Sequence, residues 1–137
     1  WLKTQVLTSI SGDSDVLTNV DSLKCSIMMI DAGVVQSFKC DCEWDNSNGA
    51  INVMLWKLDV SATTGSPLTT LAMDHIATIT FADPSDTTAF SALQSATLDS
   101  TAASFTAGQS IMVTAQSSDA TDGNYVYLRP CVTVKYT

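Results

Sequence analysis

Four cysteines are the most reactive side chains in this chain of 137 residues, and two of them form a Cys-x-Cys pair. On a strand, Cys40 and Cys42 would point to the same face with their Cα atoms about 6.6 Å apart and their side chains parallel, so a disulfide between them would distort the strand. A zinc site would need four well-spaced ligands, and the chain contains a single histidine. We therefore predict free thiols, including Cys25 and Cys131, which favours synthesis in a reducing compartment.

The single histidine, His75, follows Asp74 directly. Neighbouring residues of a strand point to opposite faces, so this pair would not form the contact that a catalytic dyad needs. The Gly-x-Ser-x-Gly turn that carries the nucleophile of many hydrolases does not accompany it. We expect His75 to be a structural or surface residue, and we expect the protein not to be an enzyme.

Carboxylates form three groups near expected loops, as an oxygen-coordinated cation such as Ca²⁺ would need. Their spacing does not match the calcium-binding loop of an EF-hand, and paired-carboxylate hydrolysis has no better support. Solvated surface charge is the expected role, so no metal and no other cofactor is predicted. The three groups are Asp13 with Asp15, Asp41 with Glu43 and Asp45, and Asp119 with Asp122.

The net charge of -8 comes from 14 acidic and 6 basic residues. Nucleic acid and anionic membranes are therefore poor partners, because their phosphates would be repelled. The longest apolar run, residues 26–35, is interrupted by Asp31 and Gly33 and does not resemble a membrane span. The first residues lack the apolar stretch of a signal peptide. The chain does not begin with Met, so we expect that it starts after processing or is the end of a longer one. The basic residues are scattered over Lys3, Lys24, Lys39, Lys57, Arg129 and Lys135.

The elements that must position these side chains are strands. Between Gly33 and Trp44 apolar and polar residues alternate, which predicts a half-buried strand, and the Asn-Ser-Asn-Gly sequence at residues 46–49 predicts a hairpin turn. A nearly continuous apolar run follows and suits a strand covered on both faces. No segment predicts a helix of convincing length, although residues 89–98 would also suit a short helical turn.

Eight strands separated by turn signals predict one all-β domain over residues 1–137, an antiparallel β-sandwich of the jelly-roll type. An immunoglobulin-like sandwich is the competing fold, but Cys42 and Cys131 lie too far apart in the chain for its usual intersheet bridge. Phe38, Leu55 and Ile111 are predicted core residues, with Val113, Val132 and Val134. The predicted strands are 2–10, 23–30, 34–44, 51–60, 71–81, 89–98, 111–116 and 125–136.

Three aromatic residues are the candidates for contact with a partner: Trp56, Tyr125 and Tyr127. Trp44 and Trp56 flank the central hairpin, and one or both would suit the core. An exposed one would mark a subunit interface or a platform on which a sugar ring stacks. The two tyrosines lie on the face of the last strand opposite Val126 and Leu128.

Four segments of the chain resemble strands of the jelly-roll domains in tailed-phage fibres and capsid decoration proteins. Such domains are similar to the trimeric heads of tumour-necrosis-factor and complement-C1q proteins, in which a Phe-x-Ala-Gly-Asp corner opens a late strand. Here Phe105 plugs the end of the sandwich, Gly108 supplies a positive φ, and Gln109 stands where aspartate is usual. The segments are residues 32–35, 51–57, 105–113 and 127–134.

The resemblance implies a non-enzymatic virion protein, made in the host cytoplasm, that decorates a capsid or forms part of a fibre. Its partners would be other virion proteins or copies of itself, as a homotrimer, with a glycan at the host surface as a further ligand. Trp56, Tyr125 and Tyr127 would lie in the contacts between subunits. A carbohydrate-binding module or lectin-like domain is the alternative, and it would place an exposed Trp or Tyr beside Asp and Asn on a sheet face.

Overall fold

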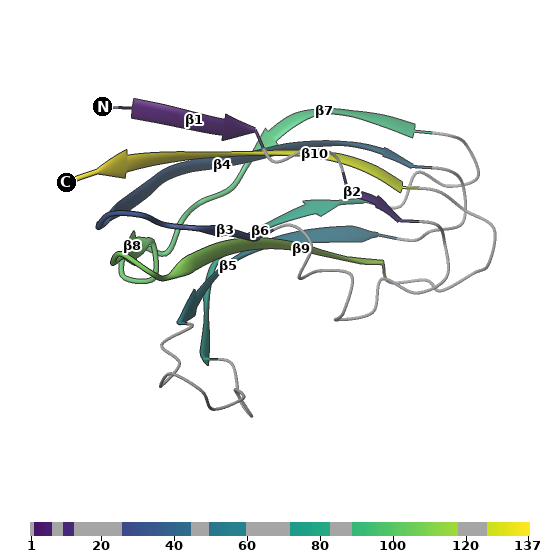
Figure 1. Ribbon diagram of the computed structural model, residues 1–137. Helices are drawn as coiled ribbons and strands as arrows, with labels where there is room; N and C mark the ends of the chain where they lie inside the picture. The colour runs from purple at the N-terminus through teal and green to yellow at the C-terminus, as the bar shows by residue number, and fades with distance from the viewer. Residues whose placement is uncertain are drawn as a thin grey trace.

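The computed structural model places the strands in two layers, drawn nearly edge-on in Figure 1. Its regular structure is all β, and every strand pairing that it describes is antiparallel. The described part of the chain holds no helix long and apolar enough to cross a membrane. The structure describes residues 2–6, 10–12, 26–44, 50–59, 72–82, 89–117 and 126–137.

Sheet A has the strand order β1-β10-β4-β7, with two short additions at its sides. Its members are β1 (Leu2–Val6), β10 (Val126–Tyr136), β4 (Gly33–Trp44) and β7 (Ala89–Ser95), with β2 (Ile10–Gly12) beside β10 and β8 (Ser104–Phe105) beside β4. Sheet B has the order β3-β9-β5-β6. Its members are β3 (Ser26–Met28), β9 (Ser110–Ser117), β5 (Ile51–Asp59) and β6 (Ala72–Phe81).

The pairing of the eight main strands is nested. The first pairs with the last (β1 with β10), the second with the second-last (β3 with β9), and so on through β4 with β7 to the central hairpin of β5 and β6. Two further pairings, β10 with β4 and β9 with β5, join these pairs into the two sheets. This is the order of a jelly roll, in which two Greek keys fold over one another.

A core between the sheets is built by strand alternation. On β5, Ile51, Val53 and Leu55 are buried while Asn52 and Met54 are only partly covered. The six core residues predicted from the sequence are all buried. The buried cluster contains Met29, Val35, Phe38, Cys40, Cys42, Ile51, Val53, Leu55, Ile76, Ala77, Ile79, Phe81, Ala103, Phe105, Ile111, Val113, Ala115, Leu128, Val132 and Val134.

One end of the sandwich, where β8 and the end of β10 lie, is closed by an aromatic contact (Figure 1). Phe105 belongs to the core and meets the Tyr136 ring edge-on with 6.1 Å between ring centroids. A Cβ on Gly33 would lie 2.8 Å from the Phe105 ring and 2.4 Å from the Lys135 carbonyl oxygen, so only glycine fits there. Gly108 has a φ of 87°, which confirms the predicted positive φ at this corner.

The observed strand boundaries lie close to those predicted, with three differences. The first predicted strand appears as two segments, β1 and β2, with residues 7–9 outside the described ones. β3 covers Ser26–Met28 and ends before a bend at residues 30–31, while residues 23–25 of the predicted strand lie outside the described ones. β8, whose two residues pair with Gly33 and Val34, was not predicted. Residues 89–95 form β7, which confirms the strand predicted there over the helical turn that these residues also suited.

Pro130 is buried in the middle of β10, a strand with neighbours on both sides. It lies opposite Cys40 on β4. On the other side, the pairing with β2 ends at Leu128 and the pairing with β1 begins at Cys131, with a change of register by one residue between them. Proline has no N–H to donate, and sheets tolerate it at irregular positions such as a change of register.

Candidate functional site

The outward face of sheet B carries no Lys, Arg, Asp or Glu among its described side chains. Strand alternation defines this face. Directly paired residues of neighbouring strands point to the same side of the sheet, and the next residue along each strand points to the other side, toward the core. We call it the sheet B face. Its described residues are Ser26 and Met28 on β3; Ser110, Met112 and Thr114 on β9; Asn52, Met54, Trp56 and Leu58 on β5; and Met73, His75, Thr78 and Thr80 on β6.

Methionine is concentrated on the sheet B face, which holds four of the five methionines in the chain. Met28 is 67% exposed and Met73 is 41% exposed. Leu58 and Met112 are 3% and 2% exposed, yet neither belongs to the core cluster between the sheets. The face therefore has two exposed methionines at its opposite edges, while the two apolar side chains between them are already covered.

Trp56 lies near the centre of the sheet B face and is held by its neighbours. Its indole Nε1 donates a hydrogen bond of 2.8 Å to Thr114 Oγ1, and its ring meets His75 edge-on at 5.0 Å between centroids. The His75 Nε2 atom is 2.7 Å from Thr78 Oγ1. Because these bonds fix the ring, Trp56 would lose little conformational entropy when a partner covers it.

The polar strip beside Trp56 is bonded within the face as well. Thr80 Oγ1 donates to Asn52 Oδ1 at 2.7 Å, and the two residues are cross-strand neighbours on β6 and β5. Uncharged hydroxyl and amide groups thus occupy the end of the face away from Met28 and Met73. One end of the sheet B face is therefore apolar, and the other end is polar but uncharged.

The outward face of sheet A, which we call the sheet A face, is charged in contrast. Its cross-strand pairs set Tyr127 beside Glu43, Arg129 beside Asp41 and Cys131 beside Lys39. Arg129 Nε lies 2.6 Å from Asp41 Oδ1, and this hydrogen-bonded carboxylate raises the pKa of the guanidinium. Exposed ion pairs of this kind add little stability.

The structure separates the aromatic residues that the sequence suggested for partner contacts. Trp56 lies on the sheet B face, while Tyr127, 44% exposed, lies on the sheet A face. One flat contact cannot include both. Tyr125 and the side chain of Trp44 lie outside the described part of the structure. Trp56 is not a member of the core cluster, so it is not the core tryptophan that the sequence allowed.

The side chains considered for chemistry lie apart from one another. Asp74 bonds to Lys57 Nζ at 3.0 Å, on the side of β6 opposite His75, as strand alternation predicts. Asp41 is engaged by Arg129. Within the described residues, no three His, Cys, Asp or Glu side chains gather as a metal ion would require. The remaining carboxylates of the three candidate groups, except Glu43, lie outside the described part: Asp13, Asp15, Asp45, Asp119 and Asp122.

Three cysteines are free, as predicted, and Cys25 lies outside the described residues. Cys40 and Cys42 are buried in the core, and this burial raises the pKa of each thiol to about 12. Thiols with so high a pKa remain protonated at neutral pH and are poor nucleophiles. Cys131 is partly exposed on the sheet A face.

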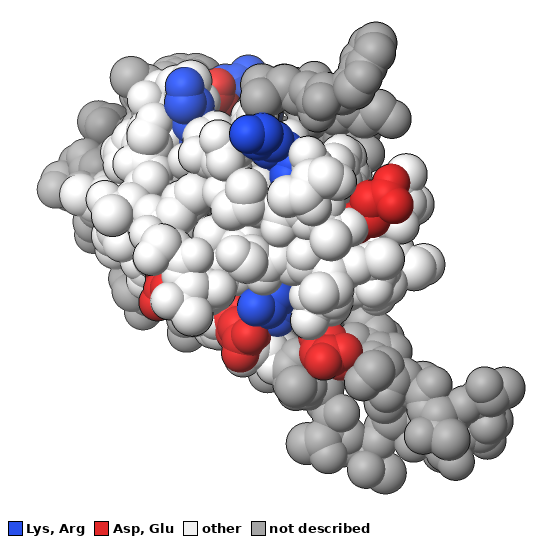
Figure 2. Space-filling model, turned by 90° about the vertical axis from the view of Figure 1, so that its left-hand side faces the viewer, with Lys and Arg blue, Asp and Glu red and all other residues white. Residues whose placement is uncertain are grey.

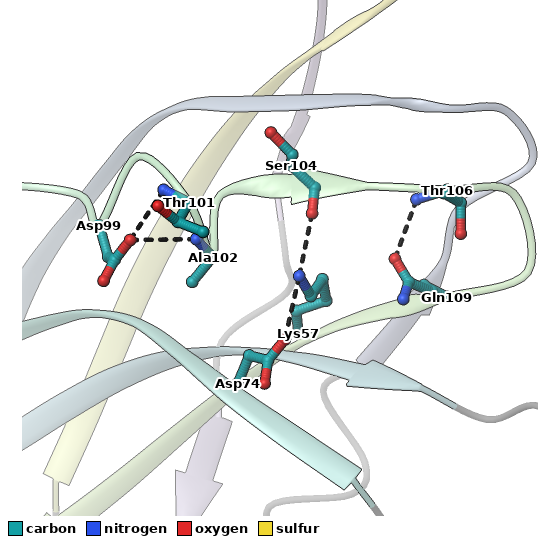
Figure 3. Close-up of polar contacts among 8 residues, drawn as sticks. All are labelled: Lys57, Asp74, Asp99, Thr101, Ala102, Ser104, Thr106 and Gln109. Carbon is teal, nitrogen blue, oxygen red and sulfur yellow. Dashed lines mark hydrogen bonds and ion pairs between the residues drawn. The ribbon is translucent and has the colours of Figure 1, made fainter.

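Polar contacts fix the end of the sandwich next to the sheet B face (Figure 3). Lys57 reaches from β5 across to sheet A, where its Nζ donates to the Ser104 carbonyl oxygen at 3.1 Å. At the Phe105 corner, Gln109 Oε1 accepts a hydrogen bond of 2.9 Å from the Thr106 N–H, so the glutamine at the unusual position closes the turn itself. No local sequence signal marks Lys57, Met28 or Met73 as candidate site residues, because their positions matter only once the strand order is known.

A turn between β7 and β8 lies in the same region and is held by Asp99. Asp99 Oδ1 accepts hydrogen bonds from the N–H groups of Ala102 and Thr101, at 3.0 and 2.8 Å, and these bonds lower the pKa of the carboxyl. The Asp99 N–H also donates to the Ile76 carbonyl oxygen at 2.8 Å, which ties the turn to β6. The end of the sandwich is therefore held in one arrangement by bonds between both sheets.

In the comparisons with known proteins, no family model, no curated protein and no solved structure matches this chain.

Proposed function

We propose that this protein is a non-enzymatic structural component of a virion, a capsid decoration or fibre protein that acts through contacts with other virion proteins or with copies of itself. The jelly-roll order of its strands supports the proposal, because capsid proteins are among the main users of this fold. Lectins and cupins use it too, so the argument needs a feature of this chain besides its fold.

That feature is the sheet B face, and it is the observation that carries the proposal. Cores of protein interfaces are enriched in methionine and aromatic residues and depleted of charge. The face has this composition on a chain whose net charge is -8. The homotrimer implied by the resemblance is the form of assembly we propose, and in a closed trimer this surface would meet a second, different surface of the neighbouring copy.

Carbohydrate binding is the second candidate function, and Trp56 is the observation that favours it. Trp56 is held in place by Thr114 and His75 and offers a ring on which a sugar could stack. Asn52 and Thr80 on the same face offer uncharged groups for hydrogen bonding. A glycan at the host surface would be the ligand in that case. The same face would then be free in a monomer.

Size-exclusion chromatography with light scattering on the wild-type protein tests the proposed function. A stable oligomer of defined mass is expected, and addition of oligosaccharides should leave the tryptophan fluorescence unchanged. A monomer at about 100 μM, well above the dissociation constants of stable oligomers, would contradict assembly from copies of this chain. A monomer whose tryptophan fluorescence saturates with one class of glycan would establish the second function instead.

A further inference from the structure

We propose that His75, Met73 and Met54 bind a soft monovalent cation, Cu(I) or Ag(I), on the sheet B face. The ligands are one imidazole nitrogen and two thioether sulfurs. They belong to a single chain, so the site does not require a second copy and goes beyond the proposed function. The thiolates and carboxylates that zinc and calcium sites use are not among them.

Soft ligands are concentrated on this face. It holds four of the five methionines and the single histidine of the chain, and none of its described side chains is an Asp or a Glu. Thioether sulfur is a soft, uncharged ligand that suits Cu(I), and imidazole also binds copper. Ca²⁺ and Mg²⁺ need carboxylate and carbonyl oxygens instead. The side chains of the face therefore select a soft cation over a hard one.

His75 is held as a metal-binding histidine is. It is exposed, and its Nε2 atom lies 2.7 Å from Thr78 Oγ1. When Nε2 carries the proton and donates it to the hydroxyl, Nδ1 holds the lone pair that a metal needs. Histidine ligands of metals almost always use their other ring nitrogen in such a bond, which fixes the tautomer and the orientation of the ring. Thr78 therefore positions His75.

A bulge in β6 makes this bond possible. Strict alternation would place residues 75 and 78 on opposite faces of the sheet. Leu55 pairs with Ala77 and Trp56 with His75, so β6 has one extra residue here, and both Ile76 and Ala77 are buried. Bulges are common next to functional sites, where they redirect a side chain. This one brings the histidine and the hydroxyl that holds it to the same face.

The two methionines lie on two sides of His75. Met73 is two residues away on β6 and points to the same side, with its Cα about 6.6 Å from that of His75. Met54 is two residues from Trp56, the cross-strand partner of His75, and is therefore a diagonal neighbour of the histidine. Diagonal neighbours lie about 7–8 Å apart, which long side chains span. Two sulfurs and one nitrogen can thus converge on one cation.

Electrostatics also favour a cation here. The net charge of -8 attracts cations to the molecule. Lys57, which follows Trp56 in the chain, lies on the inner side of the sheet and is bonded to Asp74. Figure 2, which looks at the adjoining end of the sandwich, shows few Lys and Arg side chains there, separated by a broad uncharged surface. In the described part of the structure, a cation on this face meets no cluster of basic side chains.

Metal titration of the folded protein tests the site. Thiols compete for these metals, so the protein carries Cys25→Ser and Cys131→Ser, while Cys40 and Cys42 are buried and remain in place. Ag⁺ is added as the nitrate, and Cu(I) is added in the absence of oxygen. We expect one ion per chain with a dissociation constant below about 1 μM, and no binding of Zn²⁺ at that concentration.

NMR spectra of methionine labelled at the ε-methyl carbon locate the metal. The signals of Met54 and Met73 should shift with one equivalent of Ag⁺, because their sulfurs bind it. The signals of Met28 and Met29 should not. Met28 lies on β3, at the opposite edge of the sheet B face, and Met29 belongs to the core.

Substitutions separate ligands from bystanders. Met73→Leu removes one sulfur and should raise the dissociation constant about 10-fold or more, and Thr78→Val should raise it by a similar factor while Thr78→Ser does not. Met28→Leu is the matched control, the same change at another exposed position of the face, and should leave it unchanged. Far-UV circular dichroism and urea midpoints would show that each variant folds.

Binding that Met73→Leu and Thr78→Val leave unchanged overturns the site, and so does uptake of metal only at millimolar concentration. Repeating the titration after refolding with Ag⁺ present prevents a contact between copies from hiding the site. The mass of the metal-free protein decides the proposed self-assembly separately. A monomer that binds one ion keeps the site and removes self-assembly, whereas an oligomer that binds none does the reverse.

Discussion

Gly33→Ala is expected to destabilise the protein strongly, although the same change at most strand positions is stabilising. Gly33 lies at the start of β4, between Tyr136 on β10 and Phe105 on β8. An added Cβ would lie 2.4 Å from the Lys135 carbonyl oxygen and 2.8 Å from Cζ of Phe105. The nearer atom belongs to the backbone of a central strand and cannot turn aside.

The magnitude follows from two opposing effects. Replacing glycine by alanine in a strand interior gains about 0.5–1 kcal/mol, because the unfolded chain loses conformational freedom. An ordinary van der Waals contact of the Cβ needs at least 3.4 Å, so β4 and β10 would have to separate by about 1 Å at a paired position. Overpacking of this kind costs about 1–3 kcal/mol or more. We expect a net loss of about 2 kcal/mol.

Urea titration followed by tryptophan fluorescence would measure the free energy of unfolding. Gly108→Ala is the matched control, because its Cβ would meet no atom within 4 Å while its φ of 87° penalises a side chain. That variant should lose about 1–2 kcal/mol from backbone strain alone. In Gly33→Ala, the further change Phe105→Leu should recover little, since the closer clash is with backbone. A Gly33→Ala protein as stable as the wild type would refute the packing described at this end.

Two further predictions concern the core. Phe38→Ala removes a side chain of 0% exposure between the sheets and should lower the free energy of unfolding by about 3–5 kcal/mol in the same titration. A loss below about 1 kcal/mol would show that the other side of β4 faces the core. In the folded protein at pH 8, iodoacetamide should modify Cys131 and spare Cys40 and Cys42, whose pKa values burial raises to about 12. After unfolding without reductant, mass spectrometry should find all the thiols modified, and a disulfide-linked peptide would contradict this.

The sequence predicted the strands well where alternation was strong. Phe38, Cys40 and Cys42 alternate with polar residues, and this local pattern is sufficient to predict β4 and its buried side. β8 was not predicted, because two residues are too few to show the alternation of apolar and polar residues that marks a strand. Its pairing with Gly33 and Val34 depends on a contact between segments about 70 positions apart, which no local pattern records.

The candidate site was harder to predict, because it depends on strand order. Trp56 and Tyr127 both looked suited to partner contacts, but only the tertiary pairing shows that they lie in different sheets. Met28 and Met73 share a row because β9 and β5 lie between their strands. The change of register beside Pro130 likewise depends on the neighbouring β1 and β2, so a rule for single strands would have excluded a proline there.

The pairing of Leu2 with Lys135 means that β1 begins and β10 ends as adjacent strands at one end of the sandwich. Neighbouring strands lie about 4.8 Å apart, so a linker of a few glycines could close the chain into a ring without moving either sheet. Circular permutants opened between other strands should therefore keep the fold. For a protein tethered through either strand, the same geometry would present the opposite end of the sandwich outward, which makes that end the natural place to insert a peptide for display.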